Sequence, residues 1–371
     1  MRDARPVRTI DEREEPMMDA LLSARRRLML GALGSAALLA GCGRQQPQAT
    51  STRAPQLHFA GEAMGSTYNV KIAGVSPGPD AQRRLQDAVH DALAGVDRRM
   101  STYREDSELS RLNRHARGAF PVSEELLSVL AAARAVSEAS GGAFDVSVAP
   151  LVDAWGFGVE KRREVPAPSV LAARRASVDY RGLRLDARAG TVTKAAAGVQ
   201  ADLGGIAKGF AVDLAARALE ARGIGHYMVE AGGEVRTRGL NASGEPWRIG
   251  IERPDATPQR AHFVIPLSGR AMATSGDYRI FYEHQGRRYS HEIDPASAAP
   301  IDHGLASVTV VAEDCMHADA WATALIVMGA QRGHALASRL GLAAYFLARR
   351  PGGGFDELRT DAFAVLGGQR A

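Results

Sequence analysis

The segment HADAWATALIV, residues 317–327, decides the fold because it is apolar on nearly every side. At 3.6 residues per turn, Trp321 and Leu325 lie on one side of a helix, and Ala320 and Ala324 lie on another. A helix with this pattern is normally buried. We therefore expect residues 317–327 to form a helix inside the domain.

Asp319 is the exception in this helix, because an ionised carboxylate in a buried position needs a partner. Thr323 follows four residues later, so the two side chains share one face. One interpretation is a hydrogen-bonded core aspartate. The other is a bound cation, since magnesium and calcium prefer carboxylate and hydroxyl oxygens. The segment by itself leaves both open.

The composition of the chain is that of an ordinary globular protein. It has 371 residues, which fits one to three domains, with 45% hydrophobic and 24% charged residues. The formal net charge of +4 is small for this length, and we expect no nucleic-acid partner. Cys42 and Cys315 are the only cysteines and lie far apart. We expect neither a disulfide framework nor a zinc site.

The N-terminal region has the anatomy of an export signal. A basic run, ARRR at 24–27, precedes the apolar stretch 28–41, which is short for a bilayer span. This stretch ends in LAGC, which resembles the bacterial lipobox. We predict that residues 1–41 are an N-terminal extension and lipoprotein signal peptide, and that Cys42 is lipidated. The alternative is a buried helix that ends in Gly-Cys.

The polar, proline-containing residues 42–56 are typical of a flexible tether. We predict a single folded domain at 57–371. Its strands outnumber its helices without regular alternation, so we expect an α+β fold. The expected helices are 81–101, 123–140, 169–176, 204–223, 317–327 and 331–341, and we expect Ser123 to be the N-cap of the second. The expected strands lie within 57–74, 182–186, 191–195, 226–230, 247–253, 262–267, 279–284, 287–293, 306–311, 343–348 and 362–366.

Three stretches have residue types that carry chemistry. ADLGGIAKGFAVD, 201–213, places glycines and a lysine at the start of a helix, where free N–H groups favour anions such as phosphate. GGAFDVSVAPLVDAWGFG, 141–158, has no clean period and suits either a loop around a ring system or an irregular core loop. YSHEIDP, 289–295, sets His291 near acids, where a histidine serves as a base or as a structural residue. AMATSGDYR, 271–279, reads as a turn.

Taken together, these stretches indicate a family. AMGSTY, MSTYREDSELSRLN, the stretch 141–158, ADLGGIAKGFAVD, EAGGEVRTRG, ATSGDYR, SHEIDP and ADAWATAL occur in the order, and at about the spacing, of the ApbE family. The chain resembles these FAD:protein FMN transferases over roughly residues 57–365. The resemblance implies an α+β fold with ApbE-like mixed sheets and packed helices.

The resemblance implies magnesium-dependent transfer of the FMN half of FAD to a threonine hydroxyl of a target protein, with release of AMP. The target would carry a short flavinylation motif and be a subunit of a membrane redox complex. Family members are commonly periplasmic lipoproteins. We therefore expect the chain on the periplasmic side of a membrane in the bacterial cell envelope, with a lipid anchor and the inner membrane favoured.

The resemblance also assigns roles to residues. The cation would be held by Asp319 and Thr323 with backbone oxygens of Ala322 and Gly205. His291 would be the base for the threonine hydroxyl, with Asp294 as its orienting group. The flavin would contact Met64, Tyr103, Ala143, Phe144, Asp145, Asp202, Lys208 and the backbone near Ile293.

Two positions depart from the usual pattern of the family. Ser66 stands where threonine is more usual, and position 208 varies between acidic and basic residues among relatives. Lys208 fits a phosphate partner by charge. The rival functions are a periplasmic FAD pyrophosphatase, in which water replaces the threonine, and an FAD-binding lipoprotein without turnover. A redox flavoenzyme that uses bound FAD is a third, less favoured alternative.

Overall fold

The computed structural model describes residues 53–159 and 161–371. The predictions for residues 1–41, for Cys42 and for most of the tether lie outside these residues. Within the described part, none of the helices combines the length and apolar character that a membrane crossing requires.

An eight-stranded sheet runs through the domain, and every neighbouring pair in it is antiparallel. Antiparallel strands need no helical crossover, which explains why strands and helices do not alternate in the sequence. In order across the sheet, the strands are β1 (Gln56–Ala63), β2 (Ser66–Ala73), β6 (Tyr227–Ala231), β7 (Glu234–Arg238), β10 (Ala271–Gly276), β15 (Leu305–Ala312), β16 (Ala343–Arg349) and β17 (Phe355–Arg359).

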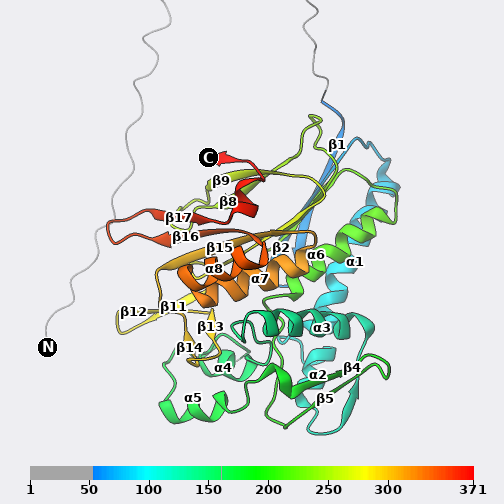
Figure 1. Ribbon diagram of the computed structural model, residues 1–371. Coiled ribbons are helices and arrows are strands. Elements are labelled where there is room, and N and C mark those ends of the chain that lie inside the picture. The colour runs from blue at the N-terminus through cyan, green and yellow to red at the C-terminus, as the bar shows by residue number, and fades with distance from the viewer. Residues whose placement is uncertain (1–52, 160) are drawn as a thin grey trace, which may run out of the picture. The chain divides into compact units, whose positions relative to one another are not determined.

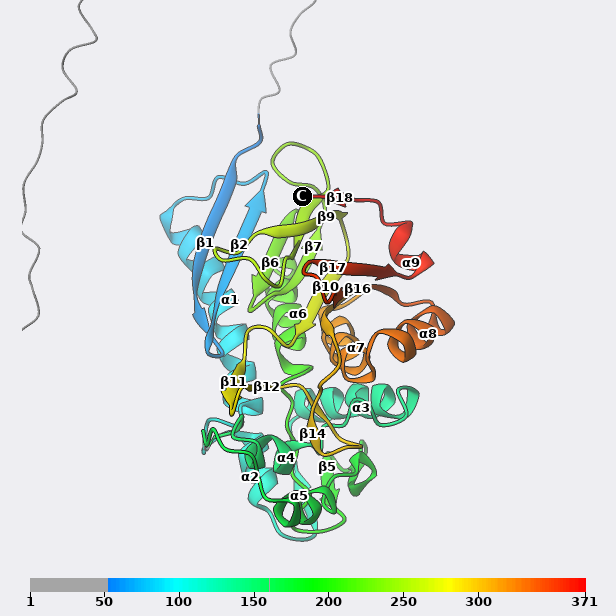
Figure 2. The ribbon, with the colours of Figure 1, turned by 90° about the vertical axis from the view of Figure 1, so that its left-hand side faces the viewer.

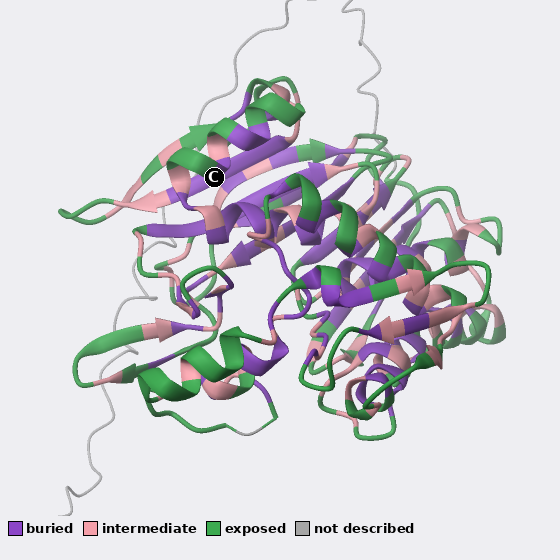
Figure 3. Ribbon diagram, turned by 60° about the horizontal axis from the view of Figure 1, so that its bottom comes forward, coloured by how far each residue is buried: buried purple, intermediate pink, exposed green. Residues whose placement is uncertain are grey.

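Each face of this sheet is covered by a different layer (Figure 1). Helices α1 (Pro79–Met100), α6 (Ala207–Glu220), α7 (Cys315–Met328) and α8 (Ala330–Leu340) cover one face. A smaller sheet of β8 (Trp247–Glu252), β9 (Ala261–Leu267) and β18 (Gln369–Arg370) packs on the other. The strands between these layers are largely buried (Figure 3).

A second group of elements lies below the helical layer in both views (Figures 1 and 2). The group contains α2 (Glu108–Arg114), α3 (Glu124–Ala139), α4 (Ala149–Ala154), α5 (Pro168–Arg175), the short η1 (Tyr180–Gly182) and the sheet β3 (Ala119–Pro121), β5 (Thr191–Lys194) and β4 (Leu183–Asp186). Ser123 caps α3 as predicted, because its Oγ accepts a hydrogen bond from Leu126 N at 3.2 Å. Two small hairpins complete the domain: β11 (Phe281–His284) with β12 (Arg287–Ser290), and β13 (Ile293–Asp294) with β14 (Ala299–Pro300).

The prediction for residues 317–327 is confirmed, because they form the body of the buried helix α7. Its side chains pack against β10, β15 and α6. Its first turn is capped by Asp314, whose carboxylate accepts a hydrogen bond from His317 N at 2.9 Å.

Two local predictions were wrong. Residues 271–276 form the central strand β10 rather than a turn, because the small side chains Ala271 and Ala273 allow close packing in the core. Residues 361–364 form the helix α9 (Asp361–Ala364) rather than a strand, since Thr360 caps it by accepting from Phe363 N. The strands β7 and β17 were not predicted, because their many polar residues give no clear alternation of apolar and polar side chains.

A buried carboxylate fixes α7 against α6. The Asp213 side chain, on α6, accepts hydrogen bonds from Cys315 N at 2.9 Å and from Met316 N at 3.0 Å. It also pairs with Arg236 of β7, at 2.6 Å between Oδ1 and Nη1. Burial raises the pKa of Asp213, and the two N–H groups and the guanidinium oppose that shift. The carboxylate thus satisfies two N–H groups that the start of a helix leaves without partners.

We predict that Asp213→Ala lowers the free energy of unfolding by about 3 kcal/mol, because it leaves a partly buried guanidinium unpaired and removes the acceptor of two N–H groups in the first turn of α7. Urea-induced unfolding followed by circular dichroism measures this change. The matched control is Asp255→Ala, which breaks an Arg–Asp pair with Arg253 at the surface, where solvent screens the charges. Equal shifts of the two midpoints would contradict the role of Asp213.

Candidate functional site

One large cavity, of about 1380 Å³, lies against the helical layer and the sheet. It exceeds the 300–1,000 Å³ or so of ordinary small-molecule sites. The sequence-predicted residues that line it are Met64, Tyr103, Ala143, Phe144, Asp145, Asp202, Gly205, Lys208, His291, Ile293, Asp319 and Thr323. Asp294 and Ala322 do not line it. The structure therefore brings together residues that lie more than 250 positions apart in the chain.

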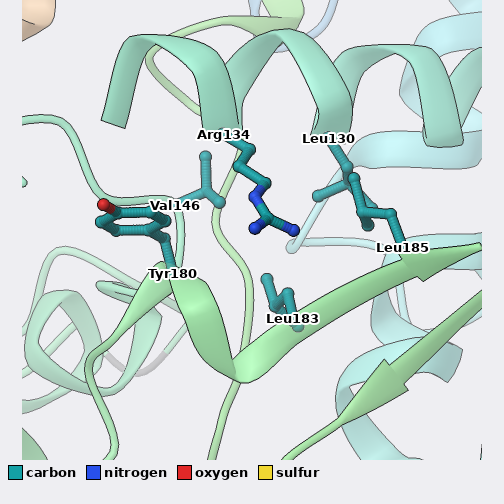
Figure 4. A pocket seen from close by; sticks show the side chains of 6 residues that line it. All are labelled: Leu130, Arg134, Val146, Tyr180, Leu183 and Leu185. Carbon is teal, nitrogen blue, oxygen red and sulfur yellow. The ribbon is translucent and has the colours of Figure 1, made fainter. Parts of the chain in front are cut away.

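A second hollow, lined by Leu130, Arg134, Val146, Tyr180, Leu183 and Leu185, contains none of the predicted site residues (Figure 4). Its volume of about 10 Å³ is no more than a single water needs. We therefore place the functional site in the large cavity.

Asp319 and Thr323 line this cavity from α7, one helical turn apart. Asp319 Oδ2 accepts from Gly209 N at 3.0 Å, and no hydrogen bond to Oδ1 is recorded among the described residues. Thr323 Oγ1 lies 3.1 Å from Ser275 Oγ of β10. Gly205 is close to Thr323, because a Cβ there would sit 2.8 Å from Thr323 Oγ1. Burial raises the pKa of Asp319, and Lys208 and the Gly209 N–H oppose this.

Lys208 makes an ion pair with Glu234, a residue that the sequence reading did not single out. Burial by itself would lower the pKa of Lys208, but the carboxylates of Glu234 and Asp319 outweigh it and raise that pKa. Burial raises the pKa of Glu234 to about 7, although Lys208 opposes the shift. Glu234 Oε2 is buried and has no hydrogen-bond partner among the described residues. The sequence signal for it was an acid directly after the paired glycines of EAGGEV.

His291 lies at the cavity wall as a neutral imidazole. Burial lowers its pKa to about 4, and the charge of Lys208 acts in the same direction. Its Nδ1 is enclosed without a hydrogen-bond partner in the described structure, whereas Nε2 lies 3.7 Å from Glu292 Oε1. Burial raises the pKa of Glu292 to about 8. Glu292 is therefore the carboxyl group beside the histidine.

Asp294, the orienting group expected from the sequence, has a different environment. Its carboxylate accepts hydrogen bonds from Ala296 N at 2.9 Å and Ser297 N at 3.2 Å, which closes a tight turn. No contact between Asp294 and His291 is recorded in the described part of the chain. Sequence proximity gave no means to rank Asp294 against Glu292, because both are near His291 in the chain.

Met64 occupies a strained turn at the edge of the cavity. Met64 and Gly65 have φ of +54° and +70° and join β1 to β2, the signature of a two-residue type I′ hairpin. A methionine rarely adopts this conformation, and such residues concentrate at functional sites. The strain agrees with a binding role for Met64.

The loops around the cavity are held by their own carboxylates. Asp145 accepts from Ser147 N, Ser147 Oγ and Tyr180 N at 2.6 to 3.1 Å, and burial raises its pKa. Asp202 accepts from Gly204 N at 2.7 Å. Both carboxylates therefore shape the loops that carry Phe144 and Gly205.

Tyr103 offers an aromatic face to the cavity. Its side chain is 62% exposed, while its hydroxyl donates to Phe157 O at 3.0 Å. An exposed ring that is tethered at its tip can stack on a planar ligand. Phe144 is largely buried and lines the same cavity.

Comparisons with known proteins identify the family of this chain. The model of the ApbE family matches residues 64–346. An FAD:protein FMN transferase from Vibrio cholerae is 42% identical and covers 91% of this chain and 98% of its own length. One from Haemophilus influenzae is 42% identical, with 84% of this chain and 91% of the relative covered.

Solved structures share the fold. The flavin transferase ApbE from Vibrio cholerae superposes with a TM-score of 0.77 at 42% identity, covering 84% of this chain and 99% of that one. The ApbE protein of Thermotoga maritima gives 0.75 at 30% identity, with 84% and 99% covered. The α+β fold expected from the resemblance is confirmed, and the chain belongs to the ApbE family.

Proposed function

We propose that this chain transfers the FMN half of FAD to a threonine hydroxyl of a target protein, with release of AMP and dependence on magnesium. Its relatives are FAD:protein FMN transferases, and the chain aligns with nearly their whole length. The chain is a flavin transferase of that family. The observation that carries the detail is the cavity itself. It gathers oxygen ligands at Asp319 and Thr323, a cation at Lys208 and a neutral imidazole at His291.

The donor set around Asp319 fits a hard cation. Asp319 keeps one carboxylate oxygen without a recorded hydrogen bond, the Thr323 hydroxyl faces the same cavity, and Gly205 leaves room beside it. In the part of the chain that the structure describes, no cluster of three or more His, Cys, Asp and Glu side chains is arranged to hold a metal. The backbone oxygen of Gly205, which lines the cavity, and the substrate phosphates would complete the shell, whereas Ala322, the other expected backbone ligand, does not line the cavity. A bound magnesium ion would neutralise charge on the pyrophosphate.

The chain's own residues account for positioning and proton transfer. Lys208 and the N-terminal N–H groups of α6 favour a phosphate at that end of the cavity. The threonine oxygen attacks the phosphorus of the FMN half, and the bond from that phosphorus to the bridging oxygen breaks, so AMP leaves with that oxygen. Nε2 of His291 accepts the hydroxyl proton, since Nδ1 is enclosed. Glu292 lies beside Nε2 and helps to orient the ring.

The test is to incubate the full chain with FAD, magnesium and a fragment of a target protein that bears a flavinylation motif, and then to record the intact mass of the fragment. We expect an added FMN phosphoryl group that is absent when magnesium is chelated. Free FMN and AMP without an adduct would show a pyrophosphatase. Unchanged FAD would leave an FAD-binding lipoprotein.

In this assay, Asp319→Asn should abolish magnesium-dependent transfer. The amide oxygen can still accept from Gly209 N, so the variant should stay folded while it loses the charge that attracts a cation. A magnesium titration followed by the thermal unfolding midpoint gives a second measurement, in which the wild type shifts and the variant does not. Asp356→Asn, at a side chain that is 68% exposed and outside the cavity, is the matched control. A normal magnesium response in Asp319→Asn would disprove the metal assignment.

We expect His291→Ala to slow transfer by about 100-fold, because it removes the proton acceptor. FAD affinity should change little, since a neutral imidazole contributes no charge to phosphate binding. Single-turnover transfer rates and FAD fluorescence titration separate the two quantities. An equal loss of both would make His291 a binding or folding residue.

The cellular setting of this function also belongs to the proposal. The LAGC sequence supports lipidation at Cys42 and an anchor on the periplasmic side of a membrane in the bacterial cell envelope, with the inner membrane favoured. An acceptor subunit of a membrane redox complex would then lie at the same surface. Residues 1–41 would be removed as the signal peptide.

Replacing Cys42 tests this setting. Cys42→Ala should move the protein from the membrane fraction to the soluble fraction, because it removes the thiol that carries the lipid. Fractionation and immunoblotting measure the change. Cys315→Ala is the control for loss of a thiol, since Cys315 is buried in the folded domain. Unchanged membrane association of Cys42→Ala would exclude lipidation at this position.

A further inference from the structure

Strand β8 is an edge strand of the small sheet, and its free edge borders the large cavity. The strand order is β18, β9, β8, so β8 has a partner only on the β9 side among the described strands. Free edges expose a row of N–H and C=O groups that can pair with another chain. No residue of this edge has a role in the transfer reaction proposed above.

A proline shows which residues of β8 point to the free edge. Arg248 lies opposite Pro266, which lacks an N–H, so this pair cannot exchange two hydrogen bonds. The bonded pairs of the ladder are therefore those of Trp247 and Ile249. Pairs alternate along an antiparallel ladder, so the N–H and C=O groups of Arg248 and Gly250 point away from β9.

The cavity reaches around this edge. Ile249 and Gly250 both line it, although these successive residues face opposite sides of the small sheet. Both faces of β8 meet only at its free edge. The cavity therefore runs along the row of unpaired backbone groups.

This part of the cavity continues to the reaction site along β6. We call the part of the cavity beside β8 the groove. Met228 lines it, and Gly232, four residues later, lies in the turn beside Lys208. A Cβ at Gly232 would sit 3.5 Å from Lys208 Cδ. At about 3.3 Å per residue, the groove and the phosphate end are about 13 Å apart. An extended segment of four or so residues spans that distance.

The groove has excess positive charge. Lys71, Arg248 and Arg260 line it, and none of them has a recorded ion pair among the described residues. Two carboxylates also line it: Glu252 pairs with Arg279, whereas Glu230 accepts from the neutral Asn69 Nδ2 and keeps its charge, so three unpaired basic side chains face one unpaired carboxylate. The surface therefore favours a partner that carries negative charge.

We propose that the free edge of β8 binds the extended acceptor segment of the target protein as an added strand, with acidic residues of that segment facing Lys71, Arg248 and Arg260. The proposal rests on the protein-directed transfer proposed above. Main-chain pairing holds the segment in register, and its hydroxyl residue reaches the site beside Lys208. This accounts for a cavity larger than one small ligand needs.

Two substitutions at Gly250 test the backbone pairing. Gly250→Pro removes the outward N–H, whereas Gly250→Ala keeps it, and both bring a Cβ about 3.2 Å from the Ala261 Cβ. We expect KM for the acceptor fragment to be about tenfold higher in Gly250→Pro than in Gly250→Ala, from the loss of one hydrogen bond. FAD affinity, measured by fluorescence titration, should agree between the two variants. Circular dichroism confirms that both are folded.

A charge reversal tests the electrostatic part. Arg248→Glu should raise KM for the acceptor fragment and weaken its dependence on ionic strength. Arg339→Glu, on the far helix α8 and outside the cavity, is the matched control. The effect of Arg248→Glu should shrink when acidic residues of the fragment are replaced by amides.

The outcomes separate this proposal from the function on which it rests. If the wild type forms no adduct, the transfer itself fails and the docking proposal fails with it. If the wild type forms the adduct but KM is the same in Gly250→Pro and Gly250→Ala, only the docking proposal is overturned. A loss of FAD affinity in Gly250→Pro without a change in acceptor KM would show that the groove holds FAD, which also overturns it.

Discussion

The close contact between α6 and α7 is the constraint on which the site depends. Asp213 ties the first turn of α7 to α6, and Gly209 lets the two backbones approach, because a Cβ there would collide with the Cys315 carbonyl. The same Gly209 donates its N–H to Asp319. One helix pair thus fixes the carboxylate of α7 against Lys208 of α6. A shift of either helix would separate the groups on which phosphate chemistry relies.

Three buried acids surround Lys208 at one end of the cavity. Burial raises the pKa values of Glu234, Glu292 and Asp319, and Lys208 opposes each shift without cancelling it. One lysine is too little to balance three carboxylates in a medium of low dielectric constant. A pyrophosphate would add more negative charge, so its binding would be coupled to a compensating cation or to protonation of these acids. This charge balance supports the magnesium dependence that we propose.

The sequence predicted the features that rest on local patterns. The apolar periodicity of α7 and the Ser123 cap were recognisable because helix burial and capping depend on residues three or four apart. It failed for β10, whose small residues read as a turn and are buried because α7 covers one face of the strand and the small sheet covers the other. The Lys208–Glu234 pair joins residues 26 positions apart, and no local pattern encodes such a contact. Family resemblance supplied the candidate residues. The structure then placed Glu292 beside His291 and Asp294 in a turn of its own.

Cys315 has a consequence for how the protein matures. The thiol is free and fully buried, and burial raises its pKa well above the ordinary value. The thiolate is the form that reacts with oxidants and disulfides, so the Cys315 thiol is unreactive once the domain has folded. Cys315 is the one cysteine in the sequence of residues 53–371, so the described part of the chain cannot form an internal disulfide. The covalent framework of this part is therefore the same in a reducing and in an oxidising compartment.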